Sequence, residues 1–176
     1  MGQIGPEILG RLFDEHVAAL VLFARPWCDA PEDVVQDAFI ALAHQDPVPD
    51  RLVAWLYRVV RNGAIAAARR SRRRRHRERR VADREITPGA PWFEATDDRI
   101  DAAHAARLVD ELDAETREIV IARIWGGLTF DEVGQLQGCS LTTAHRRYQA
   151  GLARLHERLE SPWTPTATTR TRSDPT

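Results

Sequence analysis

The stretch from residue 129 to residue 159 constrains the fold most strongly. Thr129 and Glu132 form the Thr-x-x-Glu pattern of a capping box, which marks the first turn of a helix. Gly138 follows at the point where a helix ends in a left-handed residue, a conformation that glycine adopts most easily. Ser140 is suited to cap a second helix. The stretch therefore predicts two helices joined by a tight turn.

The longer second helix has two contrasting sides. Its predicted core stripe, spaced by three and four residues, is Leu141, Ala144, Tyr148, Leu152, Leu155 and Leu159. At about 100° per residue, the outer face carries Thr142, Thr143, Arg146 and Arg147, with His145 on its flank. Arginines bind phosphates or guanine edges and small hydroxyls permit close approach, so this face suits the DNA major groove. The alternative is an ordinary amphipathic helix with a solvated basic face.

Composition limits the classes of protein that the chain can be. With 43% hydrophobic residues among 176, it can fill the core of one domain or of two small ones. It has neither an apolar run long enough for a membrane span nor a signal-peptide pattern, so we expect a cytoplasmic protein without a membrane partner. The two cysteines, Cys28 and Cys139, are far apart and the six histidines are scattered. We therefore predict no metal, cofactor, disulfide or enzymatic site.

The charges are segregated along the chain. All 25 basic residues are arginine, and nine of them fall within residues 69–80. Acidic residues dominate residues 1–50 and 85–120. This distribution predicts two partner surfaces, one of which binds a polyanion. The arginine run could instead be a flexible basic linker with only non-specific affinity for DNA.

Helical spacing of apolar residues extends over the rest of the chain. It predicts helices over residues 7–24 and 31–44, a third from residue 51 into the arginine run, and a further pair between residues 100 and 125. Asp29 and Asp50 are the expected caps of the second and third helices. The predicted core includes Ile8, Phe13, Ile124 and Trp125. The polar side of the second helix, with Asp33, Gln36 and Asp37, reads from its residues alone as a solvated acidic face. An all-α fold follows.

Four motifs in this order resemble bacterial extracytoplasmic-function sigma factors. They are Asp33-Val-Val-Gln-Asp-Ala-Phe, Ala54-Trp-Leu-Tyr-Arg-Val-Val-Arg-Asn, Leu112-Asp-Ala-Glu-Thr-Arg-Glu-Ile-Val and Gly127-Leu-Thr-Phe-Asp-Glu-Val-Gly. The resemblance covers about residues 8–160. Each motif is loose by itself, but the four in sequence are specific.

The resemblance implies two small helical domains. Residues 6–80 correspond to sigma region 2, which binds core polymerase, recognises the −10 element and melts DNA. Residues 101–160 correspond to region 4, whose helix-turn-helix recognises the −35 element. Residues 81–100 would form a flexible linker and residues 161–176 a disordered tail. Trp92 and Phe93 in the linker would either pack back onto a domain or form an exposed contact.

The resemblance also implies partners and site residues. Core RNA polymerase would be bound through its β′ coiled coil and its β flap, and Asp33, Gln36 and Asp37 would contact the coiled coil. Promoter DNA near −10, with its phosphates, would contact Arg58, Arg61, Asn62, Arg69, Arg70, Arg72 and Arg73. The −35 element would contact Thr142, Thr143, His145, Arg146 and Arg147. Members of the family are often restrained by an anti-sigma factor, which no residue here identifies.

One departure and one alternative accompany this interpretation. Members commonly carry Val-Lys-Ser-Arg in the recognition helix where this chain has Ala144-His-Arg-Arg147, so a promoter sequence cannot be transferred. The alternative function is a stand-alone helix-turn-helix regulator that binds duplex DNA. An acidic helix followed by a Trp-x-Tyr-Arg helix argues against it, because a regulator of that kind needs no such module.

Overall fold

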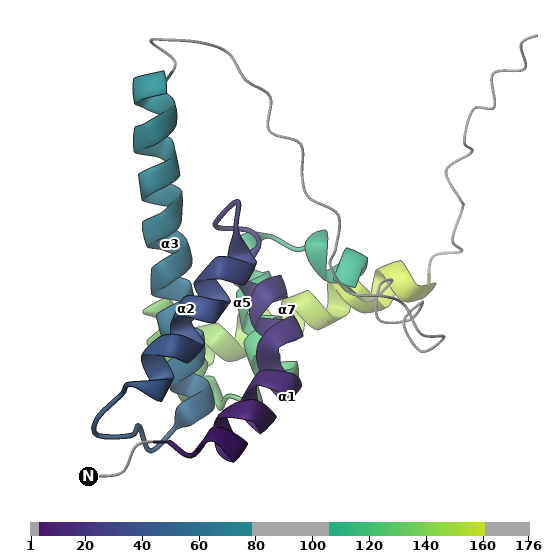
Figure 1. Cartoon of the computed structure of the whole chain (residues 1–176). Helices are drawn as coiled ribbons and strands as arrows, with labels where there is room; N and C mark the ends of the chain where they lie inside the picture. The colour runs from purple at the N-terminus through teal and green to yellow at the C-terminus, as the bar shows by residue number, and fades with distance from the viewer. Residues whose placement is uncertain (1–3, 79–105, 161–176) are drawn as a thin grey trace, which may run out of the picture.

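The computed structural model describes residues 4–78 and 106–160, and every regular element within those ranges is a helix (Figure 1). The first unit consists of α1 (Pro6–Ala24), α2 (Pro31–Ala43) and α3 (Leu52–Glu78). A short helical segment at residues 106–110 leads into the second unit, formed by α5 (Ala114–Ile124), α6 (Phe130–Gln137) and α7 (Leu141–Glu160). The predicted all-α fold with two helical units is confirmed. The predicted linker, Trp92 and Phe93 and the predicted tail lie outside the described residues.

The first unit is held together by α2, which contacts both α1 and α3. Its apolar side is buried as predicted, and Leu20 and Phe23 of α1 and Leu56 of α3 complete the core. Pro31 begins α2, where its missing N–H costs nothing. The predicted cap by Asp29 is wrong. Ala30 precedes the helix without a side-chain cap, because the Asp29 carboxylate instead accepts a hydrogen bond from the Ser71 hydroxyl of α3 at 2.9 Å.

The third helix continues through the arginine run to Glu78. It begins at Leu52, one residue later than a cap at Asp50 implies, and the Arg51 carbonyl accepts the first hydrogen bond, from the Trp55 N–H at 2.9 Å. Figure 1 shows the C-terminal half of α3 extending past the other helices as one continuous rod. The part of the run up to Glu78 is therefore a helical arm.

The helix-turn-helix forms as the sequence predicts. The Thr129 N–H donates to the Glu132 carboxylate at 2.8 Å, and the Glu132 N–H donates to the Thr129 hydroxyl at 3.3 Å. Gly138 ends α6 with φ of 69°, the left-handed region that side chains with a Cβ disfavour. The Ser140 hydroxyl accepts the Thr143 N–H at 3.2 Å and caps α7. Both α6 and α7 pack against α5.

Several apolar residues predicted in the core are exposed instead: Ile8, Phe13, Ile124, Trp125, Leu141 and Leu159. All of them lie at or near a helix end except Phe13, whose ring packs edge-on against Phe39 of α2. The buried residues of α1, for example, all lie between Ala19 and Ala24. Helical periodicity identifies the face of a helix that turns inward, but the length of that face depends on how far the neighbouring helices reach.

The two units are in direct contact. α1 contacts α5 and α3 contacts α6, so that one continuous apolar cluster includes buried residues of both units. Tyr57 of α3 is fully buried at this interface. A Cβ placed on Gly126, after α5, would lie 2.7 Å from a ring carbon of Tyr57, so the close approach requires glycine. Within the described ranges, none of the helices combines the length and apolarity of a bilayer span.

Candidate nucleic-acid interface

The outer face of α7 carries the residues predicted to meet duplex DNA. Thr142, His145 and Arg146 are exposed, while Thr143 and Arg147 are half-buried. The Thr143 hydroxyl lies 2.9 Å from that of Ser140 and so takes part in the cap of α7. The His145 ring packs edge-on against Phe130, with the ring centroids 4.9 Å apart. The face thus offers free donors at Thr142 and Arg146 and a histidine held in place by an aromatic ring.

Arg147 forms an ion pair within the second unit. Its Nη1 lies 2.7 Å from a carboxylate oxygen of Glu115 on α5. The Arg147 side chain is 37% exposed and that of Glu115 is 57% exposed. Water screens such a pair, so it contributes little to stability, about 0–1 kcal/mol. A DNA phosphate or base edge can therefore replace Glu115 at small cost.

The α3 residues predicted to meet the −10 region are in different environments. Arg58 and Asn62 are exposed as expected. Arg61 is less exposed than the sequence suggests, because its Nε donates to both carboxylate oxygens of Glu118 on α5, at 3.0 and 3.2 Å. The Gln137 amide of α6 also donates to Glu118. Arg61 is therefore engaged by the second unit.

Glu118 is an ionisable side chain with no exposed surface. Burial raises its pKa above the usual value, and the charge and hydrogen bond of Arg61 reduce this rise without cancelling it. Arg61 supplies the counter-charge for an ionised carboxylate at this position. Removing one partner of such a pair is costly, because a buried charge is left uncompensated.

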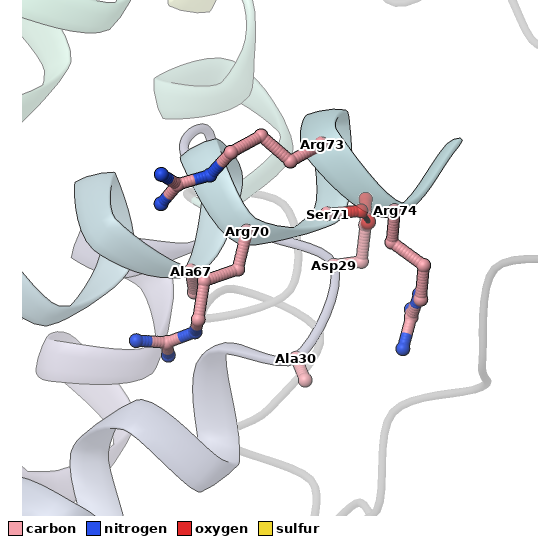
Figure 2. A pocket seen from close by; sticks show the side chains of 7 residues that line it. All are labelled: Asp29, Ala30, Ala67, Arg70, Ser71, Arg73 and Arg74. Atoms are coloured by element: carbon pink, nitrogen blue, oxygen red, sulfur yellow. Dashed lines mark hydrogen bonds between the residues drawn. The ribbon is translucent and has the colours of Figure 1, made fainter. Parts of the chain in front are cut away.

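The arginine arm lines a basic pocket of about 800 Å³. Figure 2 shows the guanidinium groups of Arg70, Arg73 and Arg74 spread around the hydrogen bond between Asp29 and Ser71. Arg69 and Arg72, also predicted to meet phosphates, are exposed on the same helix. Planar guanidinium groups around an open hollow fit the oxygen atoms of a phosphate backbone.

A second pocket, of about 460 Å³, lies between the units. Its lining from the first unit includes the loop before α3, Trp55 and Arg58, and its lining from α6 includes Glu132, Gln135 and Leu136. Arg51 closes one side through an ion pair with Glu132 at 2.7 Å. Partial burial opposes ionisation of Glu132, but the hydrogen bonds of Thr129 and the charge of Arg51 outweigh it and lower the pKa of Glu132.

The polar side of α2 forms a separate acidic surface. Asp33, Gln36 and Asp37 are all exposed, one helical turn apart, above the buried residues Val34 and Ala38. The structure thus separates the predicted polymerase-binding residues from the basic residues of α3 and α7. No group of three or more His, Cys, Asp or Glu side chains in the described part of the chain is arranged to hold a metal ion.

Glu115 and Glu118, the acidic partners of Arg147 and Arg61, were not predicted from the sequence. The signal for Glu118 in the sequence is that it directly precedes four apolar residues, 119–122, all of which the structure buries. An acidic residue directly before four buried apolar residues indicates a buried charge, but not the identity of its partner.

Two family models match the chain. Sigma-70 region 2 matches residues 12–74, and Sigma-70, region 4 matches residues 105–155. The RNA polymerase sigma factor NccH of Alcaligenes xylosoxydans xylosoxydans is 31% identical over 163 residues, which cover 86% of this chain and 87% of that protein. The RNA polymerase sigma factor CnrH of Cupriavidus metallidurans is 29% identical over 166 residues, with 86% of each chain covered.

Two solved structures share the fold. One is the sigma factor RpoE of Bartonella quintana in complex with the anti-sigma factor NepR, with a TM-score of 0.61, 24% identity, and 90% of this chain and all of that chain covered. The other is CnrH in complex with the cytosolic domain of CnrY, with a TM-score of 0.54, 24% identity, and 90% and 92% of the two chains covered.

A three-helix unit followed by a helix-turn-helix unit, each matched by its own model, defines the sigma-70 class of transcription initiation factors. Within that class, the similarity to NccH and CnrH extends over most of the length of all three chains. The chain belongs to the extracytoplasmic-function sigma factors.

Proposed function

We propose that this sigma factor binds core RNA polymerase and directs it to promoters, where it recognises the −35 and −10 elements and assists strand separation. It would act as a polymerase subunit without enzymatic activity of its own. The observation that carries the proposal is the exposed acidic surface of α2, with Asp33, Gln36 and Asp37. A regulator that acts on DNA alone has no use for this surface.

The two DNA contacts would be made by different units. The exposed Thr142 and Arg146 and the weakly paired Arg147 support insertion of α7 into the major groove at −35, the docking mode of helix-turn-helix proteins. Arg58, Asn62 and the arginine arm would follow the strand near −10. Unstacking a base costs a few kcal/mol, which its capture and the phosphate contacts along a basic groove offset.

The polymerase contact would use two surfaces. The α2 carboxylates would meet the β′ coiled coil, and the second unit would meet the β flap. An anti-sigma factor is a further expected partner, since one structural neighbour is a sigma factor in complex with an anti-sigma factor.

Co-elution with core polymerase tests the proposal. The purified protein would be mixed with core RNA polymerase from a GC-rich bacterium, without DNA, and applied to a sizing column. We expect a one-to-one complex. If the protein elutes alone and yet binds duplex DNA tightly, the stand-alone regulator is the better description.

A further inference from the structure

The exposed side of α7 carries a polar side chain that is not among the predicted DNA contacts. Gln149 follows Thr142 by seven residues and Arg146 by three, and all three side chains are exposed. At about 100° per residue, these three side chains project within about 60° of one another around the helix axis. They therefore form one ridge along two turns of α7.

Both edges of this ridge are occupied by contacts within the second unit. On one edge, three arginines pair with acidic residues around the start of α5: Arg147 with Glu115, Arg154 with Asp113 and Arg158 with Glu111. On the other edge, the His145 ring packs against Phe130. The side chains of Thr142, Arg146 and Gln149, in contrast, make no hydrogen bond or ion pair to a residue of the described ranges. The middle of the ridge is thus available to an outside partner.

The spacing along the ridge fits a helix that lies in the major groove. Counted from Thr142, the predicted contacts stand at i, i+3 and i+4, and Gln149 stands at i+7. Base-reading residues have the same spacing on the recognition helix of homeodomains. Gln149 lies about 4.5 Å along the axis from Arg146, between one and two base-pair steps of B-DNA. The exposed neighbours Ala150 and Ala153 are small, so α7 can approach the base edges closely at this point.

The carboxamide of glutamine matches one base in particular. Its amino group donates and its oxygen accepts, and adenine presents the acceptor N7 beside the donor N6 in the major groove. Arginine donates twice, which fits O6 and N7 of guanine. We infer that Gln149 is a further base-reading residue of α7, and that it selects an adenine one or two base pairs from a guanine selected by Arg146. This inference rests on the proposed −35 contact and adds the chemistry of its sequence preference.

Selection from a pool of random duplexes tests the inference. The full-length protein would bind the pool, and the recovered duplexes would be sequenced over several rounds. We expect a site with a guanine and an adenine one or two base pairs apart, the adenine being preferred about 5- to 150-fold over other bases, as one bidentate pair provides. A strongly enriched site without such an adenine would refute the role of Gln149.

Gln149→Glu distinguishes base reading from structural support. A carboxylate only accepts hydrogen bonds, so it pairs with the N4 amino group of cytosine in place of adenine. We expect the preference at this one position to change from adenine to cytosine, with the guanine preference retained. Gln149→Ala should lose the preference at the same position alone. An adenine preference that persists in either variant would exclude Gln149 from base reading.

Gln135→Glu is the matched control, because it makes the same substitution at an exposed position of α6. It should leave the adenine preference unchanged. The same shift to cytosine in this control would mean that added charge sets the preference, and the inference would fall.

The selection also separates this inference from the proposed function. If the wild-type protein enriches no sequence, the proposed −35 recognition fails together with the role of Gln149. If it enriches a site that lacks the adenine, only the role of Gln149 fails. Binding to core polymerase is measured separately by co-elution and does not affect either reading.

Discussion

Arg61 and Arg147, both predicted to contact DNA, pair with acidic residues that differ in burial. The burial of the partner decides how easily each arginine can exchange it. Glu115 is 57% exposed and Glu118 is fully buried. An exposed pair exchanges its carboxylate for a phosphate at little cost, whereas a buried carboxylate keeps its counter-ion as long as it stays buried. The Arg147 guanidinium can therefore exchange its partner in the structure as it stands, whereas Arg61 stays paired while Glu118 is buried.

Arg147→Ala should weaken binding to the −35 element. If the guanidinium contacts a base edge, the loss is about 1–3 kcal/mol in binding free energy, with relaxed preference at one position. Fluorescence anisotropy with a duplex selected from a random pool by the protein itself measures both effects.

Arg154→Ala is the matched control for this experiment, because Arg154 lies on the same helix and pairs weakly with Asp113 at 3.5 Å. Equal affinities for the wild type and the Arg147 variant would exclude Arg147 from the interface.

Residues whose environment is set by their own helix could be predicted from the sequence. The exposure of Thr142 and Arg146 follows from the apolar stripe on α7, since helix geometry fixes the angle between the two sides. The engagement of Arg61 could not be predicted, because its partner is 57 residues away and belongs to another unit. Helical periodicity carries no information about such a pair.

Whole elements show the same difference between features set by neighbouring residues, which were predicted, and contacts between distant residues, which were not. The capping box of Thr129 and Glu132 and the left-handed Gly138 were predicted correctly, because both features depend on residues within one or two turns. The cap expected at Asp29 failed, since the Ser71 hydroxyl of a different helix lies within hydrogen-bonding distance of its carboxylate. Local signals locate helix ends reliably only where no tertiary partner competes for the capping side chain.

The acidic surface of α2 is the element on which the proposed polymerase binding depends. Asp33→Arg together with Asp37→Arg should abolish the complex with core polymerase, because both residues project from the exposed side and the change reverses the charge of the proposed contact surface. The fold should persist, as neither side chain is buried. Co-elution measures binding, and circular dichroism checks the helix content.

Asp14→Arg together with Glu15→Arg gives the same change in net charge on exposed positions of α1 and should leave the complex intact. If the α2 variant still co-elutes with polymerase, the α2 carboxylates are only a solvated surface.

At the scale of the whole molecule, the sequence indicated two units but not that they touch. Each unit has its own periodic helices, so their existence follows from local pattern. Their contact depends on Tyr57 fitting against Gly126 and on ion pairs such as Arg51 with Glu132, which join residues far apart in the sequence. The segregation of charge, in contrast, was visible in the sequence and is preserved in three dimensions: the basic arm extends past the bundle, and the acidic surface of α2 lies on a separate helix (Figure 1).

The arm should supply most of the salt dependence of DNA binding by the free protein, because it is basic and exposed. Replacing Arg69, Arg70 and Arg72 with glutamine removes up to three phosphate contacts, and each contributes about 0.9 to the slope of log affinity against log salt concentration. The magnitude of the slope should therefore fall by about 2–3 on a 40-base-pair duplex of random sequence, measured by anisotropy across a salt series.

The control variant replaces three arginines that are exposed elsewhere: Arg11, Arg107 and Arg158. It changes the net charge equally and should reduce the magnitude of the slope far less. Equal losses in the two variants would mean that DNA responds to the total charge of the protein and that the arm is no specific phosphate site.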